Sequence, residues 1–176
     1  PQAVSYLKQH KGYEDLFEGY NEADLHRGQI EKMLRLTVYR DFSKLYRFAN
    51  VEQRKFLALY FKRYEVSVIK ECLNTVFDHR DVVLNLSIFD EFFNKHSQLD
   101  INLLASSRTI EELIANLKGT EYYAPLSQLA DIERPTLFDY EMTLDLYYFA
   151  QMWKDRSKVV TKRDLEELTA AWGSKF

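Results

Sequence analysis

Hydrophobic side chains along this chain recur every three or four residues, which is the period of a helix with one apolar face. The longest such stretch covers residues 50–77, and the rest of the chain is interpreted around it. Asn50 and Gln53 have the spacing of a capping box, which predicts that a helix begins directly after Asn50. The positions expected to face the interior are Leu57, Tyr60, Phe61, Tyr64, Val68, Ile69, Cys72, Leu73 and Val76.

The charged residues of this central helix fall between its apolar rows. We therefore expect one side of the helix to face solvent or a partner. The residues assigned to that side are Lys62, Arg63, Glu65, Lys70 and Glu71.

Two further long helices are predicted, one on each side of the central helix along the chain. The first covers about residues 25–48 after a cap at Asn21 or Asp24. The short turn at residues 49–50 predicts that it packs antiparallel to the central helix. Its expected interior positions are Leu25, Ile30, Met33, Leu34, Val38, Phe42, Leu45 and Tyr46.

The other long helix is predicted to start at Pro135 and to run to about Lys158. Its interior face is expected to carry the largest apolar side chains of the segment. These are Leu137, Phe138, Met142, Leu146, Phe149, Met152 and Trp153.

Shorter elements fill the remaining sequence, and all of them are expected to be helical. We expect two turns broken at Gly12, a helix capped by Ser87 and a short apolar turn over residues 99–105. A helix from Thr109 to Gly119 and another over residues 120–130 should follow. A last helix is expected to be capped by Thr161 with Asp164 and to carry Leu165, Leu168 and Trp172. Five Gly and three Pro are few, which favours long helices with short connections. The predicted fold is therefore all-α, with antiparallel helix hairpins.

The two halves of the chain resemble each other weakly, which predicts repeated helical units. Residues 45–49 (LYRFA) match residues 146–150 (LYYFA), and residues 6–17 have a counterpart in residues 117–126. We assign residues 1–86 to a first unit and residues 87–176 to a second unit that is incomplete at its C-terminal end. Coincidence is the alternative explanation.

Composition argues against several classes of partner. With 24 basic and 27 acidic side chains, the net charge of −3 gives no overall reason to expect nucleic acid or an anionic membrane surface. The longest strictly apolar run, residues 56–61, is far too short to cross a bilayer, and the N-terminal residues do not resemble a cleavable leader. The single Cys72 lies on the apolar face of the central helix, where a buried hydrophobic role is favoured over a reactive thiol.

No motif points to catalysis, a cofactor or a metal. The segment His79-Arg80-Asp81 imitates a kinase catalytic loop, but Asn85 is one residue too close and no Gly-rich loop is present. The histidines lie on separate predicted elements without metal-ligand spacing. The sequence therefore predicts a protein that is not an enzyme.

The chain is rich in aromatic residues, with 12 Tyr and 12 Phe, and some of them are expected to lie at a binding surface. Neighbouring tyrosines on a helix point about 100° apart, so both members of a pair are hard to bury against one thin core. Tyr and Arg are favoured in protein interfaces, although tyrosines that bury the ring and hydrate the hydroxyl are the alternative. The candidate partner-interface residues are Arg63, Tyr122, Tyr123, Arg134, Tyr147 and Tyr148.

Three segments together resemble a known family. They are residues 25–31 (LHRGQIE), residues 60–70 (YFKRYEVSVIK) and residues 111–126 (EELIANLKGTEYYAPL), of which the last is the most specific. In this order they are similar to the C subunit of V-type and archaeal A-type ATPases (ATP synthases), which is called the d subunit in eukaryotic complexes.

This resemblance implies an all-α, funnel-shaped protein of three related units, of which the chain would be an internal fragment. It implies a non-catalytic, cytoplasmic component at the membrane face that joins the rotor ring (c or K subunits) to the central-stalk subunits. ATP turnover would thereby be coupled to proton or sodium transport. The alternative function from another class is a helical-repeat adaptor that binds a peptide or helix.

Overall fold

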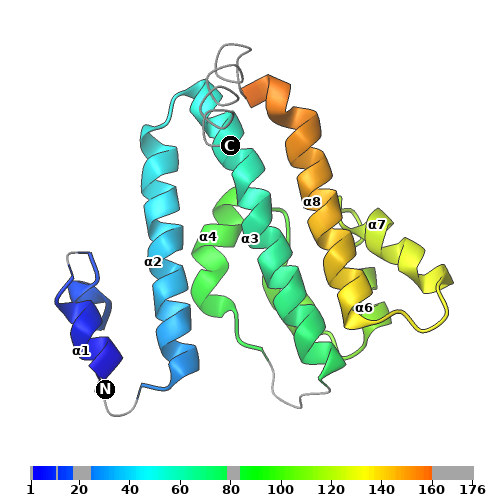
Figure 1. Cartoon of the computed structure of the whole chain (residues 1–176), viewed down its shortest axis with the longest axis horizontal. Helices are drawn as coiled ribbons and strands as arrows, with labels where there is room; N and C mark the ends of the chain where they lie inside the picture. Colours follow the sequence, from blue (N-terminus) through cyan, green and yellow to red (C-terminus); the bar gives the residue numbers. More distant parts are fainter. Residues whose placement is uncertain (1, 11, 18–24, 79–83, 160–176) are drawn as a thin grey trace, which may run out of the picture. The chain divides into compact units, whose positions relative to one another are not determined.

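The computed structural model describes residues 2–10, 12–17, 25–78 and 84–159, and every regular element in these residues is helical (Figure 1). The predicted all-α class is confirmed. The chain divides into two compact units, Pro1–Phe48 and Ala49–Phe176, which are described separately. The predicted division near residue 86 concerns sequence repeats, and it stays a prediction. The expected caps at Asn21, Asp24 and Thr161, the helix after Thr161 and the segment His79-Arg80-Asp81 lie outside the described residues.

The first unit is built from two short elements and one long helix. Helix α1 covers Gln2–Lys8, the 3₁₀ turn η1 covers Glu14–Phe17, and α2 covers Arg27–Phe48. Gly12 has φ +101°, which L side chains rarely adopt, and it breaks the helical turns as the sequence predicts. Val4, Phe17 and Met33 form the buried cluster of this unit.

The short elements cover only the first turns of α2. Leu25, Ile30 and Met33 pack into the cluster that they form. Phe42 is buried as expected, whereas Val38 and Leu45 are exposed. These two residues are seven positions apart and therefore lie on one side of α2, which faces solvent. The antiparallel packing expected between α2 and the central helix would join the two units, and it stays a prediction.

The second unit is organised around α3, which covers Val51–Phe77. Its start confirms the predicted capping box: the Asn50 side chain accepts from Gln53 N, and the Gln53 side chain accepts from Asn50 N, each at 2.9 Å. Ile69, Cys72 and Leu73 are buried on this helix, as predicted.

Helix α8, Leu137–Val159, packs antiparallel against α3 (Figure 1). Two polar bonds fasten the pair on one side. The Lys70 ammonium lies 2.7 Å from Asp145 Oδ2, and Asn74 Nδ2 donates to Glu141 Oε1 at 2.9 Å. A step of four residues along α3 therefore matches a step of four in the opposite direction along α8.

The described residues of the second unit also form shorter helical elements. They are η2 (Ser87–Phe89), α4 (Asp90–His96), α5 (Ile101–Ser106), α6 (Ile110–Asn116), α7 (Tyr123–Ser127) and η3 (Gln128–Asp131). Thr109 caps α6 as expected, but the Glu112 carboxylate accepts from Arg108 N instead of Thr109 N. Ser87 is not a cap, because Asn85 Oδ1 accepts from its N–H and its hydroxyl.

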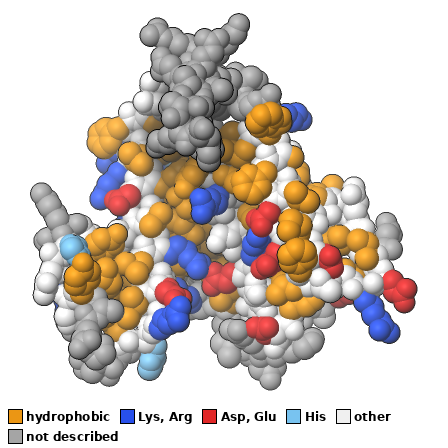
Figure 2. Space-filling view, in the orientation of Figure 1, with side chains coloured by type: hydrophobic (Ala, Val, Ile, Leu, Met, Phe, Trp, Pro, Cys, Tyr) orange, Lys and Arg blue, Asp and Glu red, His pale blue; other side chains and the backbone are white. Residues whose placement is uncertain are grey.

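The predicted interior face of α8 is wrong. Tyr140 and Leu144 are buried instead, because the tyrosine-bearing side of the helix is the one that packs inward. Leu137 and Met152 are half-buried, and the other five side chains that were expected inside form an apolar stripe on the surface, which we call the outer face of α8. It consists of Phe138, Met142, Leu146, Phe149 and Trp153, and hydrophobic side chains are visible along this helix in Figure 2.

Two leucines on α8 test this assignment directly. Leu144 is 0% exposed and Leu146 is 61% exposed. Leu144→Ala is expected to lower the free energy of unfolding by about 2–5 kcal/mol, because it leaves a cavity. Leu146→Ala should change it by about 0.5 kcal/mol or less. Denaturant unfolding of both variants makes the comparison, and equal losses would contradict the assignment.

The thiol of Cys72 gives a second test. Burial and the nearby Glu71 carboxylate raise the pKa of Cys72 to about 12. The thiolate is the reactive form, so iodoacetamide at pH 8 should modify the folded chain at least ~100-fold more slowly than the unfolded chain. Rapid modification of the folded chain would show that the α3 interior is open.

Candidate functional site

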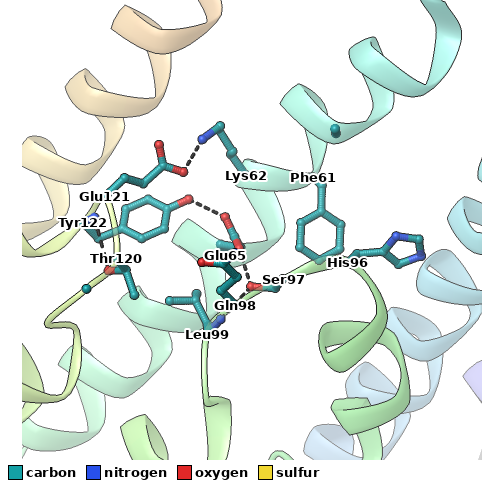
Figure 3. A pocket seen from close by; sticks show the side chains of 12 residues that line it. Phe61, Lys62, Glu65, His96, Ser97, Gln98, Leu99, Thr120, Glu121 and Tyr122 are labelled. Atoms are coloured by element: carbon teal, nitrogen blue, oxygen red, sulfur yellow. Dashed lines mark hydrogen bonds and ion pairs between the residues drawn. The ribbon is translucent and has the colours of Figure 1, made fainter. Parts of the chain in front are cut away.

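An open cavity of about 400 Å³ lies beside α3 in the second unit (Figure 3). Three segments contribute its walls: α3, the connection after α4, and the loop between α6 and α7. The side chains that line it include Phe61, Lys62, Glu65, Ser97, Glu121 and Tyr122. We call this cavity the Glu65 pocket.

The carboxylate of Glu65 is the most buried charged group in the pocket, with 8% of the residue exposed. The Tyr122 hydroxyl donates to Oε2 at 2.7 Å, and the Ser97 hydroxyl donates to Oε1. Both donors point toward the carboxylate (Figure 3). One carboxylate therefore ties α3 to two connections that are distant in the sequence.

Local backbone geometry positions the two hydroxyl groups. Ser97 Oγ accepts from Leu99 N at 3.0 Å, which holds the serine at the end of α4. Gly119 has φ +87° and turns the chain after α6, and Thr120 Oγ1 then accepts from Tyr122 N at 3.3 Å. Helix α6 ends at Asn116, three residues before the predicted stop, and Gly119 lies in the turn that follows it.

Burial determines the electrostatics of Glu65. It raises the pKa of the carboxyl above its ordinary value of 4.5, against the opposing effects of the two hydroxyl bonds and the Lys62 charge. Burial also raises the pKa of the Tyr122 hydroxyl far above its ordinary value of 10.0, so this group remains a donor. The site is therefore a carboxyl group with a raised pKa that accepts hydrogen bonds from the neutral hydroxyl groups of Ser97 and Tyr122.

A second polar set closes the side of the pocket toward α8. Lys62 forms an ion pair with Glu121, and Tyr147 donates to Glu121 Oε2 at 2.8 Å. The Tyr147 ring also meets the Tyr122 ring edge to face, with centroids 5.8 Å apart. Glu121 therefore connects α3, the α6–α7 loop and α8.

The predicted interface residues have different surroundings. Tyr122 is 1% exposed and packs in the interior, so its prediction as a surface contact is corrected. The reason is the Glu65 carboxylate, which satisfies its hydroxyl inside the fold. Tyr147 and Tyr123 are half-buried, and the Lys118 ammonium lies 6.0 Å from the Tyr123 ring centroid.

The remaining three candidates lie closer to solvent. Arg63 is exposed on α3, and its charge acts on the hydroxyl of half-buried Tyr148 on α8, so these two are neighbours. Arg134 is exposed and stands apart from the pocket, in the loop before α8 with φ 58°. The structure brings together Arg63 with Tyr148 and Tyr122 with Tyr147.

Glu65 was assigned to the charged side of the central helix, and that assignment is wrong. Its position carried a signal, because Glu65 follows Phe61 by four residues and precedes Ile69 by four. This spacing places it on the buried row. The charge of Glu65 favoured the solvent side, whereas the helical spacing favoured the buried side, and the spacing was the correct signal.

Neither a candidate metal site nor a candidate membrane-spanning helix is found among the described residues. They contain no group of three or more His, Cys, Asp or Glu side chains that could hold a metal ion. Among the helices that the structure describes, none combines the length and apolarity that a membrane crossing requires.

Comparison with known proteins identifies the family. A family model described as the ATP synthase (C/AC39) subunit matches residues 1–175. The chain belongs to this family. It is also similar to the C subunit of the A-type ATP synthase of Methanosarcina mazei, with 30% identity over 152 residues that cover 82% of this chain and 39% of that protein. No solved structure matches the chain.

The family assignment confirms the resemblance inferred from the three sequence segments. The chain spans about two fifths of the length of the archaeal relative.

The raised pKa of Glu65 predicts how stability depends on pH. Folding favours the protonated carboxyl, so its contribution is complete below about pH 4.5 and is lost as the pH rises through the higher pKa of the folded state. Glu65→Gln keeps the shape and cannot ionise. Relative to wild type, this variant should gain free energy of unfolding as the pH rises above 4.5. Parallel stability curves between pH 4 and pH 8 would contradict the assignment.

Proposed function

We propose that this chain is part of a non-catalytic coupling subunit of a rotary ATPase, where it links the ion-carrying ring to the central stalk. The family assignment supports its place in an ATP synthase complex. The mechanical role is supported by the antiparallel pair of α3 and α8, whose helices are joined by the Lys70–Asp145 and Asn74–Glu141 bonds. The ring and the stalk subunits are the proposed partners, at the cytoplasmic face of the membrane.

A coupling part must resist shear between its helices, and the second unit has bonds suited to that task. Lys70–Asp145 and Asn74–Glu141 oppose sliding of α8 along α3. Farther along the pair, Glu121 connects both helices through Lys62 and Tyr147. Because these bonds lie at several levels, sliding of one helix would break all of them together.

The outer face of α8 is the proposed main contact with the rest of the complex. Phe138 is 64% exposed and Trp153 is 68% exposed, so the stripe leaves large apolar side chains in water. Contiguous apolar patches of this kind mark interaction sites. Tyr148 and Arg63 lie on the same pair of helices and extend this contact in the proposal, while Tyr123, Tyr147 and Arg134 remain candidates.

The same exposed stripe also suits the second candidate function, a helical-repeat adaptor that binds a soluble helix. The two functions differ in their dependence on ATP turnover. A coupling subunit is needed for ion movement driven by ATP, whereas an adaptor is not.

The proposal predicts loss of coupling without loss of ATP hydrolysis. The Leu146→Asp variant of the protein would be assembled into the ATPase and reconstituted in vesicles, with ATP hydrolysis and ion uptake measured together. We expect about tenfold weaker association of the variant, because a charge replaces an apolar contact, and a fall in ions moved per ATP.

Asn94→Asp on α4 is the matched control, since it adds the same charge at another exposed position. It should leave association and coupling unchanged. Normal coupling with Leu146→Asp would remove the outer face of α8 from the contact. Normal coupling in a complex that lacks this protein would overturn the proposed function.

A further inference from the structure

The Glu65 pocket contains a carboxylate whose hydrogen-bonding capacity is only partly used. An ionised carboxylate can accept about four hydrogen bonds. The bonds found for Glu65 are one hydroxyl to each oxygen, from Ser97 and Tyr122. Capacity therefore remains for a donor that enters from the open side of the cavity.

The charges around the pocket leave an excess of negative charge when Glu65 is ionised. Lys62 is the cation in its lining, and it pairs with Glu121. His96 does not add a positive charge at neutral pH, because burial and Lys95 lower the pKa of its imidazole. Its ring also points away from Glu65 (Figure 3). The Lys62 charge acts on Glu65 but is shared with Glu121, so the negative charge of the pocket is only partly compensated and an entering positive charge is favoured.

The walls of the cavity favour a planar cation over a compact one. The rings of Phe61 and Tyr122 stand on either side of Glu65 (Figure 3). A guanidinium is planar and presents its donors in a fork that matches the two oxygens of a carboxylate. An ammonium is a more strongly hydrated point charge, so it would lose more on entering this partly buried space.

We propose that the Glu65 pocket receives the guanidinium of an arginine side chain presented by a partner polypeptide. The guanidinium donates to the Glu65 carboxylate, while Lys62 stays paired with Glu121. This inference rests on the proposed function, which places the chain among other subunits. It adds a specific polar anchor to the apolar contact along α8.

The test uses the isolated chain and three small probes that separate the effect of charge from that of head-group shape. Nα-acetyl-arginine amide is titrated against the ¹⁵N-labelled chain, and amide shifts near Ser97 and Thr120 report occupancy. We expect saturable binding with a Kd of about 1 mM, typical of one solvent-accessible anchor. Nα-acetyl-citrulline amide, which is neutral, should bind at least ~10-fold more weakly, and Nα-acetyl-lysine amide should bind several-fold more weakly.

Matched variants locate the site. Glu65→Gln removes the charge and keeps the shape, and it should weaken binding of the arginine probe at least ~10-fold. Glu91→Gln makes the same change on the exposed side of α4 and should leave binding unchanged. The Glu65→Gln spectrum without probe shows whether the variant is folded.

Several results would overturn the inference. These are no saturable binding to wild type, equal binding of citrulline, equal or tighter binding of lysine, or unchanged binding after Glu65→Gln. None of them depends on ATP-driven coupling. Failure of this inference is therefore distinguishable from failure of the proposed function, which the vesicle experiment measures.

Discussion

The antiparallel contact between α3 and α8 is the constraint on which the second unit depends. Leu73 and Leu144 are both fully buried, and the polar pairs at Lys70–Asp145 and Asn74–Glu141 fix the register of the two helices. This register decides which side of α8 faces water. The outer face of α8 and the position of Tyr147 over Glu121 are both consequences of it.

The Glu65 pocket fastens the shorter segments to this pair. Tyr122 and Glu65 are 57 residues apart in the sequence, and Ser97 and Glu65 are 32 apart. A buried carboxylate with two hydroxyl donors holds both connections against α3. The cost of burying that charge is visible in its raised pKa, and it makes the pocket receptive to a cation.

Local signals in the sequence predicted most helix boundaries. Asn50 with Gln53 and Thr109 with Glu112 mark helix starts, where the side chains bond to backbone groups of near neighbours, so their spacing is informative. The inner face of α8 was not predictable in this way. Tyr140 buries its ring, while larger apolar residues of the same helix lie outside, and only the register with α3 decides between these two sides.

The site was harder to predict than the fold, because its bonds join distant segments. The period of α3 placed Glu65 in the buried row, but nothing local showed that Tyr122 and Ser97 would satisfy it. Tyr122 is predicted at the surface because both members of a tyrosine pair are hard to bury. The spacing does not show which member is buried: Tyr122 is, because Glu65 accepts from its hydroxyl inside the fold, while Tyr123 is half-buried.

The central claim is that α3 and α8 behave as one stiff body while the ATPase turns over. Spin labels are attached at two exposed positions, through Ser67→Cys on α3 and Ala150→Cys on α8. Pulsed electron paramagnetic resonance then measures the distance between the labels in the assembled complex. The account predicts one narrow distance distribution that is the same at rest and in samples frozen during ATP hydrolysis. A distribution that broadens or shifts during turnover would show that the helices slide, and it would contradict the account.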